Sequence, residues 1–220
     1  MIGILFMHAH SMKSDIISAI RELTGLSSEI LDRVIDRYME PERHYHGLEH
    51  IQRMFKMAAA KNITPSRAQA LAILYHDVVY IPGSTNGQNE MLSALLLRQH
   101  AHGGLVPAQV VDEAVTIIHD TISHTASHHS SRLVLDLDLS GLGAHWEQFH
   151  ADSEAVFREV QHLVRDAQDY YEKRAAFFEA LCKRAQIFLL PDFAPLEPVA
   201  RQNMQQTIYA VRSDNAKENR

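Results

Sequence analysis

Hydrophobic residues recur at intervals of three and four along most of this chain, a spacing that places them on one face of an α-helix. In the segment 27–38 these apolar positions are Leu31, Val34, Ile35 and Tyr38. Ser27 can cap the first turn of that helix, and Pro41 ends it. The same spacing predicts helices over residues 47–60, 89–100, 107–122 and 153–186, and a last helix through residues 204 and 208.

The most apolar of the predicted helices leads to the pair His76-Asp77. We expect Thr64 to cap this helix and Pro65 to occupy its first position. A loop rich in proline and glycine follows over residues 81–87, where a substrate could approach the pair.

Residues 133–139 alternate apolar and polar side chains, a pattern that β-strands also show. A lone strand would have no partner, because every other long segment of the chain has helical spacing. We therefore predict a short helical or extended segment here, and an all-α helical bundle overall.

The length and composition fit a globular protein with one domain. The chain has 220 residues, of which 46% are hydrophobic and 22% charged, so it can bury a sizeable core. We predict a single domain over residues 1–220, with a core at about 14–212 and a polar, disordered tail at 213–220.

The formal net charge of −6 counts against a nucleic-acid polymer or an anionic membrane as partner, and favours a small molecule. Cys182 is the only cysteine, so an intrachain disulfide is excluded and a cytoplasmic location is expected. No apolar run approaches the roughly 20 residues that span a bilayer, and the apolar residues 1–7 lack the basic start of a signal peptide. The oligomeric state stays open, with a homodimer as one alternative.

Histidine and aspartate gather in three separate segments. The pair His76-Asp77 is preceded by His-Tyr-His-Gly-Leu-Glu-His at 44–50 and followed by Leu-Asp-Leu-Asp-Leu at 135–139. An isolated His-Asp pair is more often a hydrogen-bonded surface pair than a metal site. A histidine, then His-Asp, then an aspartate on different elements supplies four ligands that suit one divalent ion.

Further blocks of sequence accompany these segments. They are Glu40 to Ile51, His76-Asp77-x-x-Tyr80, Asn89-Glu90-x-x-Ser93-Ala94, Asp136-x-Asp138-Leu139-Ser140-x-Leu142-Gly143 and Ala200-Arg201-x-Asn203. Together they resemble the HD superfamily of metal-dependent phosphohydrolases. Over about residues 30–208 the chain is similar to a bacterial family described only as predicted phosphohydrolases of that superfamily.

The resemblance implies an HD-domain helical bundle in which His50, His76, Asp77 and Asp138 bind a divalent metal ion, which would be Mn, Fe, Co, Mg or Zn. The ion would lower the pKa of its water, and the resulting hydroxide would attack phosphorus. Asp136 would support the ligands, holding a ligating histidine in its metal-binding tautomer. The alternative is that these side chains are polar groups satisfied within the core.

The spacing Tyr45-His46-x-x-x-His50 is similar to that of cyclic-nucleotide phosphodiesterases, which implies that His46 protonates the leaving oxygen. Its alternative role is that of a helix cap or a support for a ligand. The chain lacks the acidic residue that some HD nucleotidases carry three positions past the aspartate. We therefore expect Glu90 to orient the water, with Asp77 as ligand and catalytic residue; otherwise Glu90 is a solvated acid at a helix start.

Two more residues are predicted to meet the substrate. Arg43 could clamp a phosphate with its planar guanidinium, or pair with Glu40 or Glu49. His124 belongs to a Thr-x-x-His element like that of the family, so it would touch the substrate or a second metal, and His119 has the same alternatives.

The leading hypothesis is therefore a phosphohydrolase that acts on a small phosphomonoester or phosphodiester, plausibly a nucleotide. The second is a di-iron oxygenase of the same fold, which needs extra histidine ligands. The third is a non-catalytic helical module that retains a metal and binds a ligand. No Gly-x-Ser-x-Gly or Walker-type motif occurs, so serine hydrolases and nucleotide-driven motors are disfavoured.

Overall fold

The protein is helical throughout the part that the structure describes. The computed structural model describes residues 16–218, with side chains through Ser213, and contains no β-strand in that range. The predicted all-α class is confirmed, whereas residues 1–7, which bore on the signal-peptide prediction, lie outside the described range. After a helix over residues 16–24 come α2 (Ser28–Tyr38), α3 (Leu48–Ala60), α4 (Arg67–Tyr75), α5 (Gln88–His100), α6 (Ala108–Thr121), α7 (Ser131–Leu139), η1 (Ser140–Gly143), α8 (Trp146–Val160), η2 (Gln161–Leu163), α9 (Ala167–Cys182), η3 (Pro191–Leu196) and α10 (Glu197–Glu218).

Helix α4 is the centre of the bundle. Its residues from Ala70 to Tyr75 are completely buried, as expected for a helix that is apolar on every side. It packs against α3, α5, α6 and α7. The polar residues that follow its last turn therefore emerge inside the protein, between neighbouring helices.

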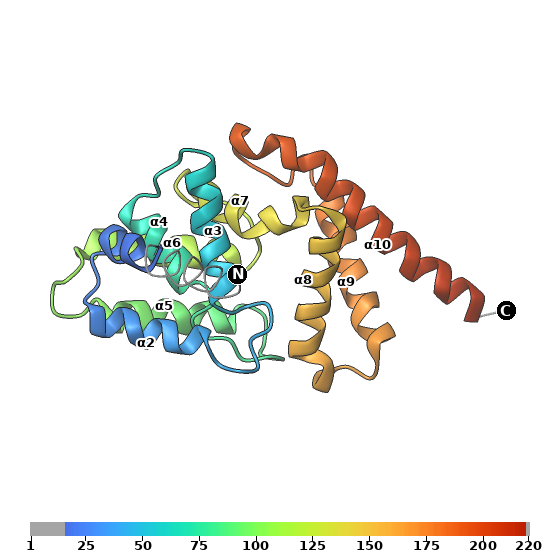
Figure 1. Cartoon of the computed structure of the whole chain (residues 1–220), viewed down its shortest axis with the longest axis horizontal. Helices are drawn as coiled ribbons and strands as arrows, with labels where there is room; N and C mark the ends of the chain where they lie inside the picture. The colour runs from blue at the N-terminus through green and yellow to red at the C-terminus, as the bar shows by residue number, and fades with distance from the viewer. Residues whose placement is uncertain (1–15, 219–220) are drawn as a thin grey trace, which may run out of the picture.

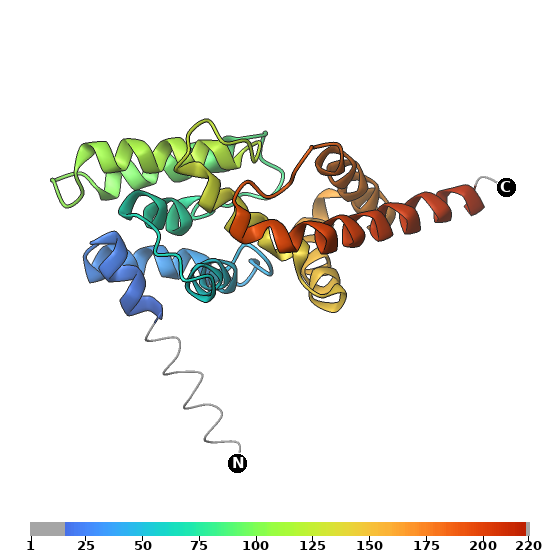
Figure 2. The same ribbon diagram turned by 90° about the horizontal axis from the view of Figure 1, so that it is seen from above.

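The helices form two groups joined by α7. In Figure 1, α2 to α6 lie at one end of the molecule and α8 to α10 at the other, with α7 between them. Figure 2 shows α10 extending away from the rest. One cluster of buried apolar side chains nevertheless spans both groups and includes Leu74, Phe149 and Phe178. No helix among the described residues is long and apolar enough to cross a membrane.

Several predicted boundaries were wrong. Helix α4 is capped by Ser66 rather than Thr64, through a reciprocal pair of hydrogen bonds with Gln69. The predicted helix over 153–186 is two helices, because Asp166 starts α9 by accepting a hydrogen bond from the backbone N–H of Asp169 at 2.8 Å.

The two ends of the described chain also differ from prediction. Residues 16–24 form a helix for which we had made no prediction. The polar tail expected to be disordered from Ser213 instead continues α10 to Glu218. The ambiguous segment at 133–139 lies within α7, a helix with almost every residue buried.

Candidate metal centre

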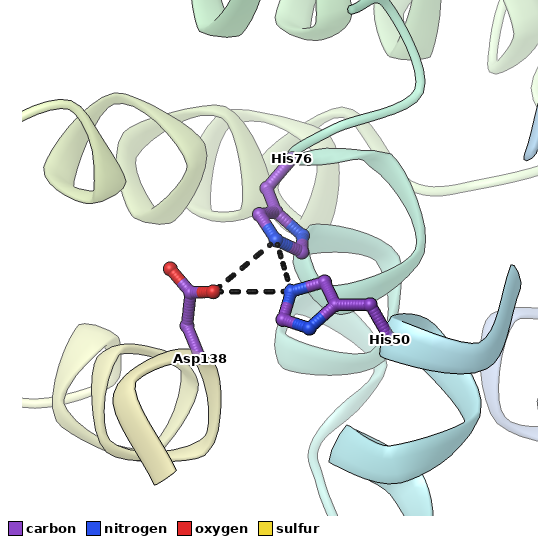
Figure 3. Close-up of side chains that lie close together, drawn as sticks. All are labelled: His50, His76 and Asp138. Atoms are coloured by element: carbon purple, nitrogen blue, oxygen red, sulfur yellow. Dashed lines mark hydrogen bonds and ion pairs between the residues drawn. The ribbon is translucent and has the colours of Figure 1, made fainter. Parts of the chain in front are cut away.

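The four predicted metal ligands come together from three helices. His50 lies on α3, His76 caps the C-terminus of α4 with Asp77 directly after it, and Asp138 lies on α7. The Nε2 atoms of His50 and His76 are 3.3 Å apart, and Oδ1 of Asp138 is 3.1 and 3.7 Å from them (Figure 3). Oδ2 of Asp77 is 3.0 Å from His76 Nε2 and 3.9 Å from His50 Nε2.

These separations fit a shared cation. Bonds of about 2.0–2.2 Å from an ion to nitrogen and oxygen place neighbouring ligands of an octahedral site ~3 Å apart. The donor atoms of His50, His76 and Asp138 all lie within 4.8 Å of one another. Two nitrogens and carboxylate oxygens form a mixed donor set that suits a divalent transition metal or Mg.

The tautomer of His76 favours metal binding. Its Nδ1 lies 3.0 Å from the carbonyl oxygen of Ile73 and donates a hydrogen bond to it. That bond keeps the proton on Nδ1 and turns the lone pair of Nε2 toward the cluster. His50 and His76 are only 3% and 2% exposed, so two facing imidazoles without a cation would be a costly arrangement in the interior.

Asp136 and Asp138 have separate roles because α7 is a helix. Both oxygens of Asp136 face away from the cluster and accept hydrogen bonds from the backbone N–H groups of Leu189 and Leu190, each at 2.7 Å. Asp136 therefore holds the segment before η3 and does not orient a ligating histidine, which corrects our prediction.

Burial raises the pKa of Asp136 to about 6, against the effect of these hydrogen bonds. At Asp138, hydrogen bonds from three histidines outweigh burial and hold the carboxyl pKa well below its usual value.

His46 is held by a buried carboxylate. Oε2 of Glu159, on α8, lies 2.6 Å from Nδ1 of His46, and Oε1 accepts hydrogen bonds from the backbone N–H groups of Tyr45 and His46. The ring of Tyr80 stacks on His46 with 4.3 Å between centroids. Burial alone would lower the pKa of His46, but the hydrogen bond to Glu159 and nearby carboxylate charges outweigh it and raise that pKa.

A cavity of about 190 Å³ adjoins the cluster. His76, Asp77 and Asp138 contribute to its wall, together with the predicted catalytic residues His46 and Glu90. Three of the four predicted ligands and both candidate catalytic side chains thus line one cavity.

His124 lies in the same cavity. Its Nε2 is 3.1 Å from Oδ2 of Asp138, the carboxylate oxygen that does not face His50. The backbone of His124 has φ 48°, a left-handed conformation, and Arg184 donates hydrogen bonds to the carbonyls of Ser123 and His124 that fix this turn. The structure thus brings His124 to the cluster.

Arg43 is not positioned to clamp a phosphate in this cavity. Its guanidinium donates to Glu40 and to the backbone carbonyls of His46, Asp77 and Val78. The side chain is 3% exposed, so a phosphate would have to break these bonds, and the predicted substrate role is corrected to a structural one.

His119 is exposed and absent from the cavity wall, so the structure does not bring it to the cluster.

Other residues of the sequence blocks quoted above form hydrogen bonds with the backbone near the cluster. Asn89 and Ser93 accept hydrogen bonds from the backbone N–H groups of Ile81 and Val79, which tether the loop after Asp77 to α5. Gly87, with φ 80°, starts α5 in a left-handed conformation that favours glycine, and so sets the position of Glu90. These blocks carry structural contacts as well as candidate ligands.

Two residues near the cluster had not been predicted. Glu159 stands on the face of α8 that carries Phe149 and Val156, and an acid on an apolar helix face is a signal that the sequence did offer. Arg174 of α9 lines the cavity, but nothing in its local sequence distinguishes it from surface arginines.

Comparisons with protein-family models, curated proteins and solved structures found no match to this chain.

Proposed function

We propose that this protein is a metal-dependent phosphohydrolase of the HD type that acts on a small phosphate ester such as a nucleotide. The observation that carries the proposal is the convergence of His50, His76, Asp77 and Asp138, with donor atoms 3.0–3.9 Å apart, beside a cavity. The four residues come from segments up to 88 positions apart, from 50 to 138, so chance adjacency in sequence does not explain their meeting.

Each residue then has a definite role. A divalent ion bound by the four ligands would lower the pKa of a coordinated water. Nδ1 of His46 is hydrogen-bonded to Glu159. The other ring nitrogen, Nε2, is therefore the atom that donates a proton to the leaving oxygen. Glu90, on the cavity wall, is assigned to orient the attacking water.

The oxygenase alternative is less well supported by the arrangement of histidines. The described residues offer one cluster suited to a metal, and of the two extra histidines only His124 adjoins it. His119 is exposed. A site with one additional histidine fits a phosphohydrolase whose substrate or second ion contacts His124.

The test is a phosphate-release screen over nucleotides, sugar phosphates and an aryl phosphate, using protein loaded with Mn²⁺. We expect release by the wild type and none by Asp77→Ala. Full metal occupancy with no release from any ester would reject the hydrolase and favour a ligand-binding module. Consumption of dioxygen by an iron-loaded protein would favour the oxygenase.

A further inference from the structure

Arg174 is a cation at the candidate active site that has no anionic partner among the described residues. It lies on α9 and lines the same cavity as His76, Asp77 and Asp138. Within residues 16–213 its guanidinium makes no hydrogen bond and no ion pair, and its Nε is buried without a partner. Buried donors in folded proteins are nearly always paired, so such a group calls for a partner that is not part of the chain.

The aromatic residues beside Arg174 hold its guanidinium in place. Its central carbon lies 4.8 Å from the ring centroid of Phe178, which is fully buried, and 5.9 Å from that of Phe177. Arginine stacks on aromatic faces in this way and keeps its donors free for hydrogen bonds in the plane of the guanidinium. The charge is thus positioned by packing and does not depend on an internal carboxylate.

Three of the four carboxylates that line the cavity are already engaged. Asp77 and Asp138 face the histidines of the cluster. Asp152 accepts hydrogen bonds from Arg53 and Gln148, each at 2.9 Å. Glu90 lines the cavity as well, and within the described part of the chain it forms no ion pair with Arg174. None of the cavity's carboxylates pairs with Arg174 among the described residues, which leaves its guanidinium available to an anion from outside the protein.

We propose that Arg174 binds an anionic oxygen of the substrate's phosphate, in the role that the sequence had suggested for Arg43. The two arginines differ in what they contact: Arg43 is satisfied by backbone carbonyls, whereas Arg174 has its donors unused beside the metal ligands. The planar guanidinium matches two phosphate oxygens at once.

The cavity also bears on the substrate. It is partly open to solvent, so it can admit the phosphate of an ester whose organic part extends along its wall. Its apolar wall, which includes Phe149, Val156 and Phe177, offers a surface for the organic part. This assignment rests on the proposed function and narrows its substrate to a small phosphate ester whose phosphate meets both the metal cluster and Arg174.

The experiment measures binding of inorganic phosphate to the Mn²⁺-loaded protein by calorimetry, so it needs no turnover. Arg174→Gln is expected to bind phosphate roughly 10- to 100-fold more weakly, the usual effect of losing hydrogen bonds to a charged group. Its metal content should equal that of the wild type. Lys173→Gln, which removes the same charge from the neighbouring exposed position, should bind phosphate normally.

Arg174→Lys covers the case in which the glutamine variant does not fold. Lysine keeps the charge but not the planar pair of donors, so we expect an intermediate affinity. Unchanged affinity in a folded Arg174 variant, or no phosphate binding by the wild type, would overturn the assignment. If an Arg174 variant binds phosphate normally and still hydrolyses esters, only this inference is rejected. If phosphate binding depends on Arg174 but no ester is hydrolysed, only the proposed function is rejected.

Discussion

The carboxylate of Glu159 lies directly behind the imidazole of His46, with Oε2 2.6 Å from Nδ1. The two residues are 113 positions apart, and the Glu159 side chain is completely buried. A carboxylate in that position fixes the tautomer and orientation of a histidine that acts through its other nitrogen. This pair joins α8 to the predicted catalytic segment and gives the first prediction.

We expect His46→Asn to affect turnover more than metal binding. Loss of a positioned general acid costs about 10²–10⁴-fold when the leaving group is poor. The variant should therefore be slow on an alkyl phosphate and nearly normal on an aryl phosphate with a good leaving group. Rates measured on both esters at equal metal occupancy decide the matter, and equal losses on the two would assign His46 a structural role.

Glu159→Gln should shift the pH dependence of turnover. Burial lowers the pKa of His46, whereas the hydrogen bond and charge of Glu159, together with the charges of Asp77 and Asp138, raise it, so the glutamine variant should have a lower His46 pKa. The protonated acid is then lost at lower pH, and the alkaline limb of kcat on an alkyl phosphate should move to lower pH. A limb at the wild-type position would show that Glu159 supports only the fold.

The residues predicted as ligands could be picked out from the sequence because each lies in a short, distinctive segment, and the structure brings them together. The preference for Asp138 over Asp136 came from the resemblance; in the structure α7 is a helix, residues two apart point about 200° from each other, and Asp138 is the one that faces the cluster. Residues that depend on distant contacts were harder to predict. Two of the three carbonyls that engage Arg43 belong to Asp77 and Val78, 34 and 35 positions away, so the local sequence left its role open.

The roles of Glu159 and Arg174 also depend on contacts between segments that are distant in sequence. Their partners, the His46 ring and the cavity wall, become neighbours only when α8 and α9 pack beside α7. The apolar face of α8 marked Glu159 as unusual, but no periodicity could identify the histidine it holds. The fold class, in contrast, follows from local spacing repeated along the chain, and it was predicted correctly.

Asp136→Asn should lower the stability of the fold, whereas Asp138→Asn should abolish activity. The asparagine amide at 136 would turn a donor toward one of the two backbone N–H groups that Asp136 now satisfies, at an expected cost of about 1–3 kcal/mol. Thermal melting should show that loss, while metal content stays normal. Asp138→Asn should instead be inactive at every metal concentration. Normal stability of Asp136→Asn together with weakened metal binding would restore the original prediction.

His76→Ala should empty the metal site with little damage to α4, because alanine is a good helix former at the end of that helix. Metal content by elemental analysis should fall to background after dialysis against trace metal. His119→Ala, which removes an exposed histidine of α6, is the matched control and should keep full occupancy. Retention of metal by His76→Ala would show that the cluster is not the binding site.

The most direct test of the account is a titration of Mn²⁺ into exhaustively chelated protein, with bound metal and phosphate release measured in the same samples. The proposed nucleophile is a water activated by the metal, so we expect no release without metal. Release should then rise in proportion to occupancy in the wild type and remain absent in Asp138→Asn. Phosphate release that survives chelation unchanged, or that is equal in Asp138→Asn, would contradict a metal-dependent phosphohydrolase.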